Sequence, residues 1–235
     1  MNLPLLILRP LDGALQTGRR AKEWGLHVVV DPLFVVEPIA WSGPETQDFD
    51  ALLLTSANAL RFGGPQLNAY RSLPVLAVGE KTAAAASAAG FHVAEMGATN
   101  AQDLLGSLDN DLYRNILWLA GENHTDLSAL DQRLEIVPVY RSNAIALGEQ
   151  AKACLAGEAV ILLHSARTAK HFVSELDRLG LPKSRHHVLA FSEKVAGAAG
   201  QGWKQQAIRM TTLYCPWRAH YAGHVETIWS VLRPD

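Results

Sequence analysis

One pattern of residues that could bind an anion occurs twice in this sequence. Residues 51–58 read ALLLTSAN and residues 159–166 read AVILLHSA, so in each copy an apolar run ends shortly before a serine. Such a run is typical of a strand buried on both faces, and serine is a preferred N-cap of a helix. A helix start exposes N–H groups and carries about half a positive charge, which suits a carboxylate or a phosphate. The alternative is that each serine only caps its helix.

A second pattern follows each copy at nearly the same distance. Residues 75–83 read VLAVGEKTA and residues 188–196 read VLAFSEKVA, so a further apolar run again leads into a helix start with Glu-Lys. Strands that alternate with helices at this spacing favour parallel sheets covered on both faces. The sequence therefore predicts an α/β protein with two similar domains, each a parallel sheet flanked by helices.

Two proline-marked segments, residues 31–38 and 137–142, divide the chain. Proline disfavours helix in the residue before it and cannot donate to a sheet ladder, so we predict connectors rather than central strands. We expect the two segments to form a two-stranded hinge between the domains. The predicted domains are residues 1–34 plus 142–235, a discontinuous first domain, and residues 35–141, a second domain with the connector strands at its ends.

A strand, helix and strand unit is expected just before the second connector. Residues 116–119 are predicted as a strand, residues 125–134 as a helix and residues 135–137 as the next strand. The first thirty residues suggest the same kind of unit, with a helix that ends at Gly25.

Tyr140 lies in the second connector, between Val139 and Arg141. In a two-domain protein with a hinge, we expect this residue to face the cleft. Tyrosine offers an aromatic surface and a hydroxyl that can donate or accept a hydrogen bond. Tyr140 is therefore a candidate ligand contact, and the alternative is that it packs the hinge.

Several standard sites do not occur in the sequence. Residues 79–82 read GEKT, with one glycine where a phosphate loop needs two, and no GxGxxG follows a predicted strand, which disfavours a nucleotide or sugar-phosphate enzyme. His220 and His224 have metal-ligand spacing but no acidic or cysteine partner in an HExxH arrangement. Ser165 follows His164 directly but lacks the glycine elbow of a hydrolase. We therefore predict neither a metal site nor hydrolysis.

Charge and cysteine content indicate the setting. The net charge is -2, from 21 Lys and Arg against 23 Asp and Glu, so no broad field attracts nucleic acid or an acidic membrane. No run approaches the roughly 20 apolar residues that span a bilayer. Cys154 and Cys215 have no CxxC spacing, as expected of a reduced interior. We expect a cytoplasmic monomer that binds neither nucleic acid nor membrane.

Six segments, in their order and spacing, resemble the uroporphyrinogen-III synthase family over essentially the whole chain. They are Arg9-Pro10, LLTSANA at 53–59, AVGEKTA at 77–83 with AGF at 89–91, PVYR at 138–141, and the weaker SAR at 165–167. The resemblance implies two α/β domains joined by a two-stranded connector, the first assembled from both chain ends.

The resemblance also implies a reaction. Linear hydroxymethylbilane loses its hydroxyl and closes with the last pyrrole ring inverted, which gives uroporphyrinogen III and water. The chain is then a cyclising lyase of porphyrin and haem biosynthesis. The resemblance implies no metal or organic cofactor. Its small-molecule partner is the linear tetrapyrrole, and a transient contact with the preceding pathway enzyme is a further expectation.

By the resemblance, Tyr140 corresponds to a connector tyrosine that aids departure of the hydroxyl. The expected substrate-binding residues are Arg9, Thr55, Ser56, Ala57, Gly79, Lys81, Thr82, Ser165, Arg167 and Lys194. The chain departs from the family at residues 191–195, FSEKV, where Ile-Gly-Pro-x-Thr is common. Residues 121–124, GENH, lack the arginine and second glycine often found there. These departures leave an alternative, a non-catalytic two-domain module that binds a tetrapyrrole or another small anion.

Overall fold

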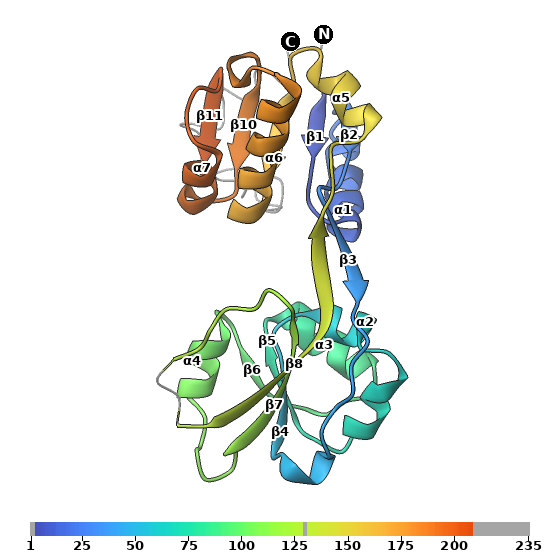
Figure 1. Ribbon diagram of the computed structural model, residues 1–235, viewed down its shortest axis with the longest axis vertical. Coiled ribbons are helices and arrows are strands. Elements are labelled where there is room, and N and C mark those ends of the chain that lie inside the picture. Colours follow the sequence, from blue (N-terminus) through green and yellow to red (C-terminus); the bar gives the residue numbers. More distant parts are fainter. Residues whose placement is uncertain (1–2, 129–130, 209–235) are drawn as a thin grey trace. The chain divides into compact units, whose positions relative to one another are not determined.

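The computed structural model describes residues 3–128 and 131–208, and the chain divides into two compact units. The first consists of Met1–Val35 and Asn143–Asp235, and the second of Val36–Ser142. Each unit contains a sheet whose parallel strands alternate with helices along the chain (Figure 1). The α/β fold class predicted from the repeated patterns is confirmed.

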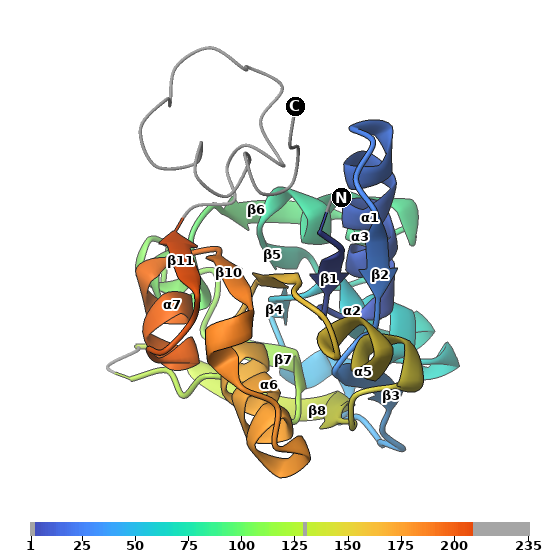
Figure 2. The ribbon, with the colours of Figure 1, turned by 90° about the horizontal axis from the view of Figure 1, so that it is seen from above.

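The first unit is built on a five-stranded parallel sheet with the order β11-β10-β9-β1-β2. The strands are β1 (Leu5–Ile7), β2 (Val28–Val30), β9 (Val160–Leu163), β10 (His187–Ala190) and β11 (Gln205–Ile208). One face packs against α5 (Glu149–Leu155), α6 (Ala166–Leu179) and α7 (Glu193–Ala199), and the other against α1 (Leu11–Glu23) (Figure 2). A short 3-10 helix, Lys183–Arg185, precedes β10. Because β1 and β9 are buried on both faces, they occur as uninterrupted apolar runs in the sequence, and in β10 such a run follows His187.

The second unit is built on a six-stranded sheet with the order β3-β8-β7-β4-β5-β6. The strands are β3 (Phe34–Pro38), β4 (Ala51–Leu54), β5 (Val75–Val78), β6 (Val93–Gly97), β7 (Asn115–Gly121) and β8 (Arg133–Ala144). One face packs against α2 (Ala57–Phe62), a 3-10 helix (Pro65–Tyr70) and α3 (Glu80–Ala88), and the other against α4 (Ala101–Gly106). A further 3-10 helix, Thr46–Asp48, precedes β4.

The five parallel strands of each unit have the same spatial order, although the chain enters that order at different points. In the first unit β9, β10 and β11 take the places that β4, β5 and β6 have in the second, and β1 and β2 take those of β7 and β8. The chain therefore reverses its direction across the sheet between β1 and β9, and between β7 and β4. In open parallel sheets, ligands bind beyond the carboxyl ends of the strands at this reversal. The residues that follow β1, β9, β4 and β7 are therefore the candidates for a ligand site.

The predicted helix over residues 125–134 is wrong. The described residues between β7 and β8 form bends and irregular backbone, and β8 starts at Arg133, which pairs with Asn115 at the start of β7. The chain must therefore return along the whole of β7, a distance of roughly 20 Å. The 11 residues between Gly121 and Arg133 would span only about 16 Å as a helix, so an extended connection is required.

The second connector is a continuous strand that pairs on both sides, whereas the sequence predicted a connector rather than a central strand. β8 pairs in parallel with β7 as far as Tyr140. The O of Leu33 accepts from the N–H of Ile145 and the O of Val139 from the N–H of Ile39, both at 3.0 Å, so β3 and β8 are antiparallel. Pro138 fits because it lies beside a register shift at the end of β7, where the ladder is already irregular.

One face of α6 contacts the first connector segment and the residues that directly follow the second. Its residues 167, 171 and 175 are four positions apart and so lie on one side of the helix. The contacts are Arg167 over the ring of Phe34 (4.5 Å), His171 Nε2 to the O of Ile145 (2.8 Å) and the N–H of Leu147 to Glu175 Oε2 (2.9 Å). These contacts fix where each connector segment meets the first unit.

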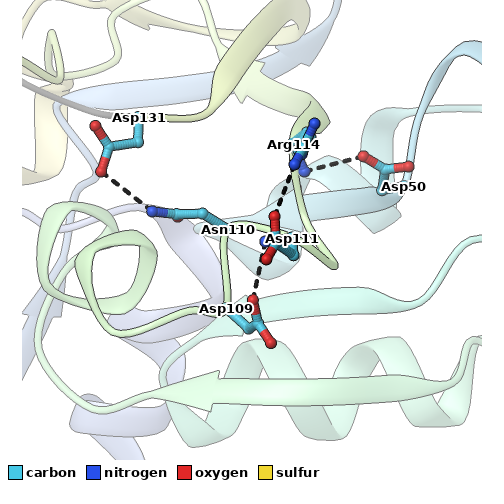
Figure 3. A network of polar contacts seen from close by, with 6 residues as sticks. All are labelled: Asp50, Asp109, Asn110, Asp111, Arg114 and Asp131. Carbon is cyan, nitrogen blue, oxygen red and sulfur yellow. Dashed lines mark hydrogen bonds and ion pairs between the residues drawn. The ribbon is translucent and has the colours of Figure 1, made fainter.

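The amino edge of the second sheet is fastened by carboxylates. Asp50 Oδ2 accepts from the N–H groups of Arg114 and Asn115 at 2.9 and 2.8 Å, which holds the start of β4 beside that of β7 (Figure 3). Asp109 closes its own turn by accepting from the N–H of Asp111 at 2.9 Å. These carboxylates are occupied by structural contacts, at the edge opposite the strand ends where ligands are expected.

Among the described residues, no helix is long and apolar enough to cross a membrane. Cys154 is half-buried and forms no disulfide within that part of the chain. Cys215, His220 and His224, which the sequence singled out, lie outside the described residues.

Candidate active site

A hydrogen bond joins the residue that follows β4 to the middle of β7, and the second sheet reverses its strand order between these two strands. Trp118 Nε1 of β7 donates to Thr55 Oγ1, which directly follows β4, at 3.3 Å. The indole is buried on the α4 face, while Thr55 is half-buried. Because the indole is the donor, the hydroxyl proton of Thr55 remains available for a carboxylate. Thr55, predicted to bind substrate, thus lies where the fold favours a ligand.

Tyr140 packs its ring directly on Gly121 at the end of β7. A Cβ added at Gly121 would lie 2.8 Å from Cε2 and Cζ of Tyr140 and 3.0 Å from its hydroxyl, so only glycine leaves room for the ring. The N–H of Glu122 donates to the O of Tyr140 at 2.8 Å, which fixes the backbone as well. The Tyr140 side chain is half-buried, and no hydrogen bond of its hydroxyl to another described residue is found.

His124 forms a hydrogen bond with the same glycine, Gly121. Its Nδ1 lies 3.0 Å from the O of Gly121, and its ring meets Trp118 edge-on with centroids 5.2 Å apart. Thr55, Trp118, His124, Gly121 and Tyr140 are therefore linked by successive contacts across β4, β7 and β8. The sequence placed Thr55 and Tyr140 in the site without showing what connects them.

The starts of α2 and α3 in the second unit differ in their N-caps and in the length of the helix that follows. Ser56 Oγ accepts from the N–H of Asn58 at 3.2 Å, so it is a true N-cap, but α2 has only 6 residues, and Ala57 is its first. The longer α3 is preceded by Gly79, whose φ of +83° favours glycine and whose O accepts from the N–H groups of Thr82 and Ala83. Lys81 is exposed, whereas the predicted substrate residue Thr82 is 5% exposed.

Arg9 and His164 follow β1 and β9, where the strand order of the first sheet reverses. The Arg9 side chain lies over Gly13 in the first turn of α1, and its Nη1 donates to Thr17 Oγ1 at 3.4 Å. Burial, together with the positive charge of Arg9, lowers the pKa of His164 to about 3. A neutral imidazole beside a guanidinium leaves Arg9 as the cation at these strand ends.

The longest described helix of the first unit is α6, and Ser165 caps its start. Ser165 Oγ accepts from the N–H of Thr168 at 3.1 Å and donates to Thr168 Oγ1 at 2.8 Å. Arg167 is exposed in the first turn, with its guanidinium over Phe34. Lys194 is exposed in the first turn of α7, which Ser192 caps. Ser56 and Ser165, the two serines of the repeated pattern, therefore both cap helices. This role accounts for their position without a ligand.

A family model described as uroporphyrinogen-III synthase HemD matches residues 16–211. The chain belongs to this family. The described residues contain no group of three or more His, Cys, Asp or Glu that could hold a metal ion. Members of the uroporphyrinogen-III synthase family are cyclising lyases of tetrapyrrole biosynthesis, and the function and enzyme class predicted from the resemblance are confirmed at this level.

Solved structures of this family have the same fold. A mutant uroporphyrinogen III synthase from Thermus thermophilus is 15% identical, with a TM-score of 0.54 over 99% of this chain and 100% of that one. The uroporphyrinogen-III synthetase from Helicobacter pylori 26695 is 15% identical, with a TM-score of 0.58 over 91% of this chain and 97% of that one. No curated protein matches this sequence.

Sequence reasoning missed two residues of the uroporphyrinogen-III synthase fold seen here. Trp118 lies within an apolar run, where nothing distinguishes an indole with a polar partner from an ordinary core residue. His124 was noted only as a departure from the family pattern. The available signal was its position three residues after Gly121, close enough for its ring to reach back to the glycine carbonyl.

Proposed function

We propose that this chain closes hydroxymethylbilane to uroporphyrinogen III, with Tyr140 as the group that assists loss of the hydroxyl. Membership of the uroporphyrinogen-III synthase family supports the reaction. The reaction requires correct orientation of the substrate more than acceleration, because the cation left by the departing hydroxyl reacts readily without help. The protein has to hold the linear tetrapyrrole so that its terminal ring is attacked at the substituted carbon.

The position of Tyr140 carries the proposal. Its ring is fixed against Gly121 while its hydroxyl remains available within the described structure, so it can donate to a leaving hydroxyl without first breaking an internal bond. Thr55, at the neighbouring strand end, can donate to a substrate carboxylate.

Both units offer groups for the carboxylates of the substrate. The starts of α3 and α6 leave N–H groups without helical partners, and Gly79 lets a ligand approach the first of them closely. Lys81 and Arg167 stand in the first turns of these helices, and Arg9 and Lys194 follow other strands of the first unit. We assign these residues to carboxylate binding. Arg167 would have to serve both its contact with Phe34 and the substrate.

The test is cyclisation of freshly prepared hydroxymethylbilane, with the isomers of the product separated by chromatography. The expected product is the type III isomer, whereas only the type I isomer of spontaneous closure would refute the proposal. Tight binding of product without turnover would instead favour the non-catalytic module.

Tyr140→Phe is expected to lower kcat by about 100-fold, since it removes one proton donor. Affinity for product should remain nearly the same, because the ring stays in place. Tyr113→Phe, just before β7 at the opposite edge of the same sheet, is the matched control and should retain full turnover. Wild-type turnover by Tyr140→Phe would remove Tyr140 from the mechanism.

We also propose where the protein acts and in which oligomeric state. We propose a monomer because all the candidate site residues come from one chain, and a cytoplasmic location because the two cysteines have no CxxC spacing. A transient contact with the preceding pathway enzyme is proposed as well. Size-exclusion chromatography with light scattering tests the monomer, and a dimer mass at micromolar concentration would contradict it.

A further inference from the structure

The hydrogen bond of His124 fixes which of its nitrogens is available. The O of Gly121 can only accept, so Nδ1 must be the donor, and in the neutral ring Nε2 then carries the lone pair. The edge-on contact with Trp118 holds the ring plane. No hydrogen bond of Nε2 to another described residue is found, and Nε2 is not among the buried polar atoms without a partner. His124 therefore presents a fixed, solvent-accessible base.

This base and the hydroxyl of Tyr140 lie at the same strand end, since both side chains contact Gly121. The Tyr140 hydroxyl would be 3.0 Å from a Cβ on Gly121, and His124 Nδ1 is 3.0 Å from the O of the same residue. With standard covalent dimensions, the Tyr140 hydroxyl and His124 Nε2 are no more than about 12 Å apart. A tetrapyrrole that reaches one of them with its reacting carbons can reach the other.

The reaction requires a base as well as an acid. Tyr140 gives its proton to the departing hydroxyl, which leaves as water and turns the methylene carbon into part of a cationic azafulvene. The substituted α-carbon of the terminal ring attacks this carbon, its old bond to the bridge carbon breaks, and the bridge carbon bonds to the free α-carbon of the same ring. That α-carbon then carries one hydrogen too many, and the phenolate of Tyr140 lacks one.

The geometry points to His124 as the base that completes the reaction, an inference that rests on the proposed function. Nε2 takes the surplus proton from the α-carbon, and the electron pair of that C–H bond restores the pyrrole. The imidazolium returns the proton to the phenolate of Tyr140 through solvent. One hydroxyl and one hydrogen have then left the substrate as water, and both side chains are back in their starting states.

The test uses His124→Asn, whose side-chain amide can still donate to the O of Gly121 but has no atom in the place of Nε2. The substrate carries deuterium at the free α-carbon of its terminal ring. We expect turnover to fall by about 100-fold and an isotope effect to appear, because proton removal becomes rate-limiting. Added imidazole should restore part of the rate and reduce the isotope effect. The product should remain type III, since ring inversion precedes proton loss.

His92→Asn is the matched control, because His92 is exposed and directly precedes β6, at the opposite edge of the same sheet. It should behave as wild type. If His124→Asn does not fold, judged by circular dichroism, His124→Gln replaces it, since its amide lies near the position of Nε2 but cannot take up a proton. Full turnover, or slow turnover with neither an isotope effect nor imidazole rescue, would overturn the role. Failure of the wild-type protein to form the type III isomer would refute the proposed function instead.

Discussion

Gly121→Ala tests whether the site depends on the exact position of the Tyr140 ring. The added methyl would lie 2.8 Å from Cε2 and Cζ of that ring. Ordinary carbon contacts are about 3.5–4.0 Å, so the ring has to move by roughly 0.7–1.2 Å. Gly121 does not have a positive φ, so alanine causes no strain in the backbone itself.

Two effects of different size follow from this movement. The ring is half-buried and can swing outward, so we expect the free energy of unfolding to fall by only about 1 kcal/mol. A misplacement of about 1 Å near the reacting atoms can lower turnover by about 100-fold. The variant should therefore be folded and almost inactive, with kcat affected far more than thermal stability.

A double-mutant cycle with Tyr140→Phe is the deciding assay. If alanine acts by displacing the hydroxyl, Gly121→Ala combined with Tyr140→Phe should be no slower than Tyr140→Phe alone. Multiplicative losses in the double variant, or normal kcat in Gly121→Ala, would refute the reasoning. Gly106→Ala is the matched control, since no atom lies within 4 Å of its added Cβ, and it should leave kcat unchanged.

Two further predictions concern stability against pH. Hydrogen bonds from Arg178 lower the pKa of Glu175 to about 2, so the stabilisation is complete above about pH 4.5 and is lost as pH falls toward 2. Glu175→Gln should lower the free energy of unfolding in urea at pH 7 by about 1–2 kcal/mol, allowing for the half-exposed Arg178, and the deficit should shrink at pH 3; a deficit independent of pH would contradict this. Burial lowers the pKa of the fully buried His186 to about 4, so the unfolded chain binds the extra proton and stability falls as pH drops from about 6.5 to 4, by up to about 3 kcal/mol. His186→Leu should lose less thermal stability than wild type between pH 7 and pH 5, and parallel decreases in Tm would rule out this cause.

The sequence was informative where a local pattern decides the structure. Ser56, Ser165 and Ser192 precede helices that they cap, because a hydroxyl before a helical pattern satisfies an N–H wherever it occurs. The apolar runs at β4 and β9 became buried central strands for the same local reason. These elements were predicted correctly without knowledge of their neighbours.

The sequence was misleading where pairing over a distance decides the structure. The segment over residues 125–134 was expected to be helical, but the parallel pairing of Arg133 with Asn115 demands a longer reach than a helix of that length provides. The link from Thr55 through Trp118 to His124 depends on the neighbouring positions of β4 and β7, although Thr55 and Trp118 are 63 residues apart in the chain. Such contacts become visible only once the strand order is known.

The permuted strand order has a consequence for synthesis on the ribosome. The second unit, Val36–Ser142, is a contiguous stretch and can fold as soon as it has emerged. In the first unit, Leu5 of β1 pairs with Val160 of β9, so β1 has its second neighbour only after more than 150 further residues have been made. Closing so long a loop costs entropy before its contacts form, which slows folding. The part of the protein that leaves the ribosome first is therefore completed last, and a nascent chain stalled shortly after Ser142 would hold one finished unit and one open strand pair.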